Sequence, residues 1–200
     1  MAARPAPSPP PCRWRLRLAR RVLAAGGILA YPTEGVYGLG CDPLRPKAVA
    51  RLLALKGRSW KQGLILVAAG PEQLRPWVDP GDPRPWERAL ATWPGPVTWV
   101  LPAAAWVPPW IRGRHPTVAV RVTAHPLAAA LCRAWGGPLV STSANRHGRP
   151  PARTALQVRR SFPRDLDLIL PGRTLGLGGP TEIRAADGRL LRRGAAPRAG

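Results

Sequence analysis

The sequence contains few acidic residues and very few lysines. Only 10 of the 200 residues are Asp or Glu, against 31 Lys and Arg, which gives a formal charge of +21. Because lysine occurs only at Lys47, Lys56 and Lys61, arginine carries nearly all of this charge. No acidic residue precedes Glu34, and none lies between Glu87 and Asp165. This balance indicates a polyanionic partner such as RNA or a nucleotide, but a general compositional bias towards Arg, Ala, Gly and Pro would explain it as well.

Several other features are missing from the chain. The three cysteines are widely spaced, with no CxxC pair and no Cys/His cluster, so neither a zinc site nor a disulfide framework is expected. No apolar run approaches the length of a membrane span, and the first residues lack the apolar segment of a secretory signal. We therefore expect a cytoplasmic protein with no membrane partner. The apolar fraction of 45% predicts one packed domain over residues 13–194, between a disordered Pro-rich tail at 1–12 and a short tail at 195–200.

The common catalytic and nucleotide-binding fingerprints are absent as well. The sequence has no Walker A loop, no GxGxxG and no GxSxG elbow. The three histidines, His115, His125 and His147, lie in turn-like contexts, and two of them precede proline. We expect surface loops for His115 and His125, and we do not expect a hydrolase triad.

Helical and strand-like patterns alternate along the chain, which favours an α/β fold. An amphipathic first helix is predicted to bury Trp14, Leu18 and Val22, together with Ala19 and Leu23, and to stop at Gly26 and Gly27. We expect residues 32–43 to form a loop and residues 103–116 to be irregular. Further helices are expected around residues 49–57, 72–78, 85–93 and 127–135 and from 154 onward. Strands are expected at residues 28–31, 64–67, 97–101, 118–122, 139–140, 168–170, 181–184 and 189–191.

The most informative segment is the STSAN run at residues 141–145, directly after the apolar strand at 139–140. It offers three hydroxyls and one carboxamide, which are hydrogen-bonding groups suited to a ligand. A strand-to-loop turn with local side-chain bonds is the structural alternative. Five such residues in succession exceed what a turn requires, so we interpret the run as part of a binding site.

Three other places invite a functional interpretation but allow a structural one. Lys56 and Arg58 end a helix, where the helix dipole favours cations, yet they also suit a phosphate clamp. Thr33 and Glu34 follow the first strand, either as a polar turn or as ligand contacts. Arg121 shares a strand face with Ala119, opposite three valines, so it needs either an exposed face or an anion.

Taken together, these segments resemble the YrdC family of threonylcarbamoyl-AMP synthases. The matching motifs run in order over nearly the whole chain, and the combination of KxR with SxN, here Lys56, Arg58, Ser143 and Asn145, is the hallmark of the family. The motifs are YPTE at 31–34, YGLGCDP at 37–43, LKGR at 55–58, PGPVT at 94–98, AVRV at 119–122, HPL at 125–127, STSAN at 141–145 and PTEIR at 180–184.

The resemblance implies a twisted, open mixed α/β sheet with helices packed on it and a concave, positively charged cleft. It implies that L-threonine, bicarbonate and ATP are converted into threonylcarbamoyl-adenylate and pyrophosphate, with Mg²⁺ accompanying ATP. The product would be passed to a threonylcarbamoyl transferase complex that modifies tRNA beside the anticodon. No covalent nucleophile or other catalytic residue is implied, because positioning and electrostatics suffice for this chemistry.

The resemblance also assigns roles to residues. For ATP it implies Lys56, Arg58, Ser143, Asn145 and Arg192. For threonine and its carbamate it implies Thr33, Thr98, Arg121, Ser141 and Thr181.

The sequence departs from the family pattern after the KxR motif, where Ser59 replaces the usual proline and a common lysine is displaced to Lys61. This places the phosphate loop's fine geometry in question. A non-catalytic module of the same fold that binds double-stranded RNA or tRNA is the main alternative function. A carbamoyl-adenylate module of hydrogenase maturation is a third, but those proteins are longer and carry zinc-finger and acylphosphatase parts. Without such parts, we expect the short, single-domain form.

Overall fold

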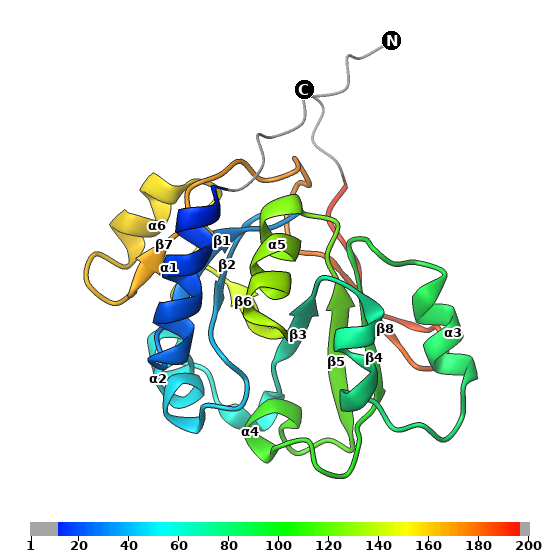
Figure 1. Ribbon diagram of the computed structural model, residues 1–200. Coiled ribbons are helices and arrows are strands. Elements are labelled where there is room, and N and C mark those ends of the chain that lie inside the picture. Colours follow the sequence, from blue (N-terminus) through cyan, green and yellow to red (C-terminus); the bar gives the residue numbers. More distant parts are fainter. Residues whose placement is uncertain (1–11, 197–200) are drawn as a thin grey trace.

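The computed structural model describes residues 12–196 of the chain. Residues 1–11 and 197–200, which make up most of the two predicted tails, lie outside this range. Within it, nine strands form one mixed sheet in the order β7-β1-β2-β6-β3-β5-β4-β8-β9 (Figure 1). The strands are β1 (Leu29–Pro32), β2 (Tyr37–Gly40), β3 (Ile65–Ala68), β4 (Val97–Pro102), β5 (Thr117–Val122), β6 (Leu139–Ser143), β7 (Leu168–Ile169), β8 (Glu182–Ala185) and β9 (Leu190–Arg192).

Six α-helices within the described residues pack on this sheet, and short 3-10 turns occupy residues 60–62, 71–73 and 75–77. The helices are α1 (Arg13–Ala24), α2 (Pro46–Lys56), α3 (Arg84–Leu90), α4 (Pro109–Arg112), α5 (Pro126–Trp135) and α6 (Ala155–Ser161). No helix in the described range is long and apolar enough to cross a membrane. The α/β architecture predicted from the sequence is confirmed.

The two faces of the sheet carry separate apolar clusters because side chains alternate along each strand. One cluster joins α1 and α5 to Leu29, Val67 and Leu139. The other joins α2, α3, α4 and α6 to residues such as Leu66 and Val140, which point to the opposite face. Figure 1 shows α1 and α5 side by side in front of the strands. These two helices cover only part of their face, and the remainder holds the site described below.

Most predicted elements are present, and local signals explain why. The Thr154 hydroxyl accepts a hydrogen bond from the Gln157 amide, and the Gln157 side-chain oxygen accepts one from the Thr154 amide, so the predicted capping box starts α6. Gly57 ends α2 in the left-handed conformation with φ 57°, as expected for a glycine at this position. The region expected to be irregular contains only the short helix α4.

Two expectations about the N-terminal third were wrong. Residues 37–40, predicted as loop, form the buried strand β2 between β1 and β6. Glycine is needed there, because a Cβ on Gly40 would lie 2.5 Å from the carbonyl oxygen of Val140. Helix α1 buries Ala19 and Leu23, whereas Trp14 is 54% exposed, so only part of the predicted face packs on the sheet.

Candidate functional site

Two adjacent rows of side chains cross the face of the sheet that carries α1 and α5. The first, which we call the covered row, consists of Leu139, Val67 and Arg121 from β6, β3 and β5. The second, the open row, lies two residues away on each of these strands, at Ser141, Ile65 and Ala119, and continues to Val100 of β4. The strand pairing therefore places the start of the STSAN run beside apolar neighbours rather than at the tip of a loop.

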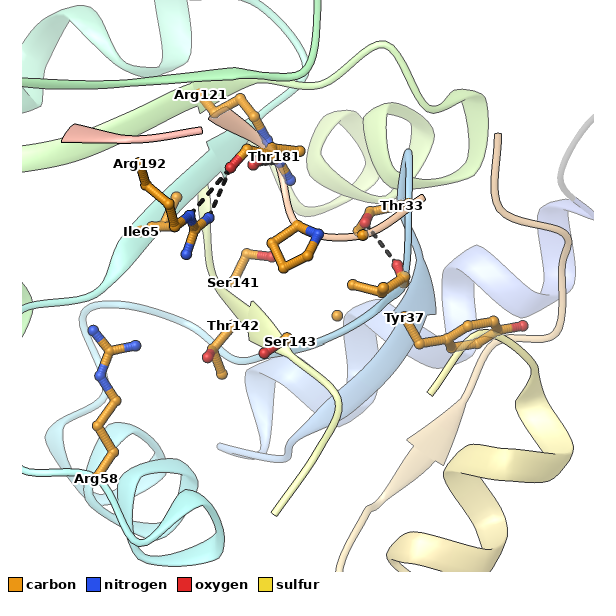
Figure 2. Close-up of a pocket in the computed structure, with 15 residues that line it drawn as sticks. Thr33, Tyr37, Arg58, Ile65, Arg121, Ser141, Thr142, Ser143, Thr181 and Arg192 are labelled. Atoms are coloured by element: carbon orange, nitrogen blue, oxygen red, sulfur yellow. Dashed lines mark hydrogen bonds between the residues drawn. The ribbon is translucent and has the colours of Figure 1, made fainter. Parts of the chain in front are cut away.

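A pocket of about 110 Å³ lies beside Ser141 and Ile65 (Figure 2). It is bounded by the ends of β1, β2 and β6, by the segment that precedes β8, and by arginines from β5, β9 and the loop after α2. Seven of the ten predicted site residues line it: Thr33, Arg58, Arg121, Ser141, Ser143, Thr181 and Arg192. Residues more than a hundred positions apart in sequence thus meet around one cavity.

Two loops meet at one side of this pocket. The Thr33 amide and hydroxyl both donate to the carbonyl oxygen of Val36, which closes a tight turn after β1. A Cβ on Gly35 would lie 2.1 Å from the carbonyl oxygen of Gly179, so only glycine permits this turn to touch the segment before β8. The close approach brings Thr33 and Thr181 to the same pocket.

Arg121 is buried with a counter-ion. Its guanidinium lies 3.5 Å from a carboxylate oxygen of Glu34 and donates a 2.7 Å hydrogen bond to the Thr181 hydroxyl. Glu34 also accepts hydrogen bonds from the Thr123 hydroxyl and the Ala124 amide. Burial alone would raise the pKa of Glu34, but the charge of Arg121 and these hydrogen bonds outweigh it and hold the pKa below its ordinary value. The sequence left open whether Arg121 lies on an exposed face or beside an anion. The structure shows that it is buried beside the carboxylate of Glu34.

Three arginines line the pocket, and no Asp or Glu lines it. Arg58 donates to the carbonyl oxygen of Gly63, and Arg192 donates to that of Thr181. Burial lowers the pKa of both groups, and repulsion from Arg121 and Arg58 lowers that of Arg192 further. Figure 2 shows Arg58 and Arg192 reaching the pocket from different sides. Arg121 is paired with Glu34, whereas Arg58 and Arg192 form no ion pair within the described residues, and two converging cations without a carboxylate partner suit a polyanionic ligand.

Lys56 and Asn145 line neither this pocket nor its neighbour. The Lys56 ammonium donates to the carbonyl oxygens of Ser143 and Asn145, both at 2.6 Å, and to the side-chain oxygen of Asn145 at 2.7 Å. Burial, and then the charge of Arg58, lower the pKa of Lys56 to about 8. The KxR and SxN motifs are therefore joined directly to each other.

Thr98, the tenth predicted residue, is fully buried in β4 and its hydroxyl has no hydrogen-bond partner in the described part of the chain. It does not line the pocket. The expectation of a surface loop for His125 was wrong: this side chain is 3% exposed and caps α5 by accepting from the amides of Leu127 and Ala128. A His-Pro pair that starts a helix was mistaken for a turn.

A second pocket, of about 390 Å³, adjoins the first and shares Arg58, Ile65 and Arg192 with it. Its walls include the rest of the open row, Ala119 and Val100, with Ile183 and Leu191 from β8 and β9. Sequence reasoning missed these apolar residues. One sequence feature could have indicated this wall: the small residue Ala119 lies on the same strand face as Arg121, opposite the three valines.

Metal-ligating side chains do not cluster in the described residues: no group of three or more His, Cys, Asp or Glu could hold an ion. Neither pocket is lined by a carboxylate. The protein therefore offers no acidic ligand set for Mg²⁺ at this site.

Comparison with known proteins agrees with the geometry. The Sua5/YciO/YrdC family model, described as "Telomere recombination", matches residues 21–194. A threonylcarbamoyl-AMP synthase of Nitrosococcus oceani is 61% identical over 180 residues, which cover 90% of this chain and 96% of the relative, and one of Halorhodospira halophila is 55% identical over 92% and 98%. The crystal structure of P. abyssi Sua5 complexed with L-threonine superposes with a TM-score of 0.84 at 35% identity. The superposition covers 90% of this chain but only 54% of the Sua5 chain, so the present chain spans about half of that protein. By both the family match and these identities, this chain belongs to the Sua5/YciO/YrdC family.

Proposed function

We propose that this protein is a threonylcarbamoyl-AMP synthase, which makes threonylcarbamoyl-adenylate and pyrophosphate from L-threonine, bicarbonate and ATP. The observation that carries the proposal is the pocket in which Arg58, Arg121 and Arg192 converge with the hydroxyls of Thr33 and Ser141. High identity to relatives named for this activity supports it.

The chemistry calls for groups of this kind. The threonine amine adds to bicarbonate with loss of water and gives a carbamate, and a carbamate oxygen then attacks the α-phosphorus of ATP while pyrophosphate leaves. Nucleophile and phosphates are all anionic, so the protein must offset their repulsion and hold them in line. Arginines that are already fixed by carbonyl oxygens, such as Arg58 and Arg192, can do this without reorganising.

The two adjoining pockets suggest how the substrates divide. Threonine and its carbamate would occupy the smaller pocket, against Thr33, Ser141, Thr181 and the buried Arg121. The phosphates would lie at the boundary, where Arg58 and Arg192 face both pockets and Ser143 lies nearby. Adenosine would extend over the apolar wall of the larger pocket. Thr98 is not on either wall, so its predicted contact with threonine would require a rearrangement of β4.

Mg²⁺ enters this proposal only with the nucleotide, since the pocket walls supply no carboxylate to bind it. The proposed activity implies a cytoplasmic location and transfer of the product to a tRNA-modifying complex.

The test is pyrophosphate release from ATP by the purified protein. We expect release only when both L-threonine and bicarbonate are present, with D-threonine as the matched control. Release that is independent of either substrate, or no release at all, would contradict the proposal.

The alternative, a non-catalytic RNA-binding module, is supported by the charge of +21. It predicts tight tRNA binding that weakens steeply as salt increases, in a protein that makes no pyrophosphate. If the affinity for tRNA hardly changed with salt concentration, most of the positive charge would reflect compositional bias instead.

A further inference from the structure

The Lys56 ammonium is enclosed by protein acceptors. Only 7% of the residue is exposed, and its three N–H groups meet three oxygens at 2.6–2.7 Å: the carbonyls of Ser143 and Asn145 and the Asn145 side chain. An ammonium has three donors and no more. All of its hydrogen-bonding capacity is therefore used inside the protein.

Asn145 is equally occupied. Its side-chain oxygen accepts from the Ser143 hydroxyl at 2.6 Å as well as from Lys56. Its side-chain nitrogen donates to the carbonyl oxygens of Arg146 and Arg149. With two acceptances and two donations, the carboxamide has no group left for a ligand.

We propose that Lys56 and Asn145 are positioning residues that fasten the end of α2 to the end of β6, and that Arg58 and Ser143 are the members of the two motifs that meet the nucleotide. This inference rests on the proposed function, and it assigns different tasks to residues that the sequence motifs group together.

The connection explains how two distant segments keep one geometry. Lys56 is the last residue of α2, and after Gly57 turns the chain, Arg58 enters the pocket. Ser143 is the last residue of β6 and lines the same pocket. Lys56 spans the 87 positions between these segments with a charge-assisted hydrogen bond, so the guanidinium and the hydroxyl are held on a common frame.

The contrast between Lys56→Met and Lys56→Arg distinguishes this arrangement from direct phosphate binding. Arginine keeps the charge and binds phosphate well, but its planar fork cannot present three hydrogens from one nitrogen to three converging acceptors. We therefore expect both variants to weaken binding of ATP with Mg²⁺ by about 10- to 100-fold in calorimetry, the scale of loss for misplaced binding groups. The matched control is Lys47→Met, at an exposed lysine near the start of the same helix, which should bind as the wild type does.

Hydrogen exchange and a double variant provide readouts that a direct phosphate contact would not move. Amides of residues 143–149 should exchange faster in both Lys56 variants without nucleotide, while the rest of the chain is unchanged. Lys56→Met combined with Asn145→Ala should weaken ATP binding no more than the worse single change, because both remove one connection. If Lys56→Met does not fold, Lys56→Arg serves in both experiments, because arginine keeps a cation beside the buried acceptor oxygens.

ATP affinity near the wild-type value in Lys56→Arg, or unchanged exchange at residues 143–149, would overturn the inference in favour of a direct contact. Multiplicative losses in the double variant would do the same. If the wild type binds no ATP, the proposed function fails, whereas the exchange experiment still tests the connection because it uses no ligand.

Discussion

The covered row and the open row lie on the same face of one sheet, two residues apart, yet they have opposite characters. Leu139 and Val67 of the covered row are fully buried under α1 and α5. Ile65 and Ala119 of the open row are only half-buried and form pocket walls, with Ser141 at their end. The strands are continuous through both rows, so the change depends on where the helices stop. A regular sheet holds the site rigidly, and the uncovered part of its face receives the ligand.

Arg121 is the exception in the covered row, since it is a charge where its row neighbours are apolar. Arg121→Met would leave Glu34 ionised and buried without its counter-ion, and we expect a loss of about 3–5 kcal/mol in the free energy of unfolding. Urea denaturation at pH 7 measures this loss. The control is Arg189→Met, which removes an exposed ion pair and should leave the midpoint unchanged. If the two changes lowered the free energy of unfolding equally, the buried ion pair of Arg121 would stabilise the fold no more than an exposed pair does.

The covered and open rows predict different outcomes for two truncations on one strand. Leu139→Ala should lower the free energy of unfolding by about 3 kcal/mol by opening a cavity beneath α5, with little change in turnover per folded molecule. Ser141→Ala should alter stability by less than about 1 kcal/mol but raise the KM for threonine. Thermal unfolding and steady-state kinetics on both variants test the pair. The distinction between a stabilising covered row and a ligand-binding open row would be wrong if Ser141→Ala unfolded the protein or left the KM for threonine unchanged.

Arg58 tests the open side of the site through catalysis. Arg58→Ala should reduce turnover about 100-fold, equivalent to about 2.7 kcal/mol, while the fold persists. Pyrophosphate release and circular dichroism measure the two properties together. Arg159→Ala on the exposed surface of α6 is the control of equal charge change. An unfolded Arg58 variant would instead assign this side chain a structural role through its bond to Gly63.

Acid should weaken the buried pair. Because Arg121 and hydrogen bonds lower the folded pKa of Glu34 below its ordinary 4.5, the stabilisation is present above that value and is lost as the pH falls through the folded pKa. The gap in stability between the wild type and Glu34→Gln should therefore be smaller at pH 3 than at pH 7, as measured by urea midpoints. A gap that widens in acid would mean that the pKa of Glu34 is raised by its burial.

The smallest effect is expected at Leu18 of α1, a helix whose predicted and observed buried faces differ. Leu18 is 37% exposed, so Leu18→Ala should change the free energy of unfolding by less than about 0.5 kcal/mol. Leu23→Ala on the buried face should cost about 2–5 kcal/mol. The change in the thermal unfolding midpoint of each variant shows which side of α1 packs on the sheet. Similar changes in both variants would mean that Leu18 is buried as well, as the sequence predicted.

Where the prediction failed, the local pattern was ambiguous. Residues 37–40 alternate Tyr37 and Leu39 with two glycines, and because glycine weakens strands they look like a loop; only neighbours on both sides make them a strand. His125 precedes proline as turn residues do, but it caps a helix. The pattern of Trp14 and Leu18 is amphipathic, but it does not say which part of the apolar stripe meets the sheet.

The sequence by itself determined the alternation of helices and strands, the capping of α2 and α6 and the chemical types that the site would use, because these depend on periodicity and on side chains near in sequence. Its motifs also indicated the family. Only the tertiary structure decided that Arg121 is paired with Glu34, that the open row lies beyond the edge of α1 and α5, and that Lys56 faces Asn145 while Arg58 faces the pocket. These outcomes depend on strand register and on contacts between distant segments, such as Lys56 and Asn145 at 89 positions apart, which no local pattern contains.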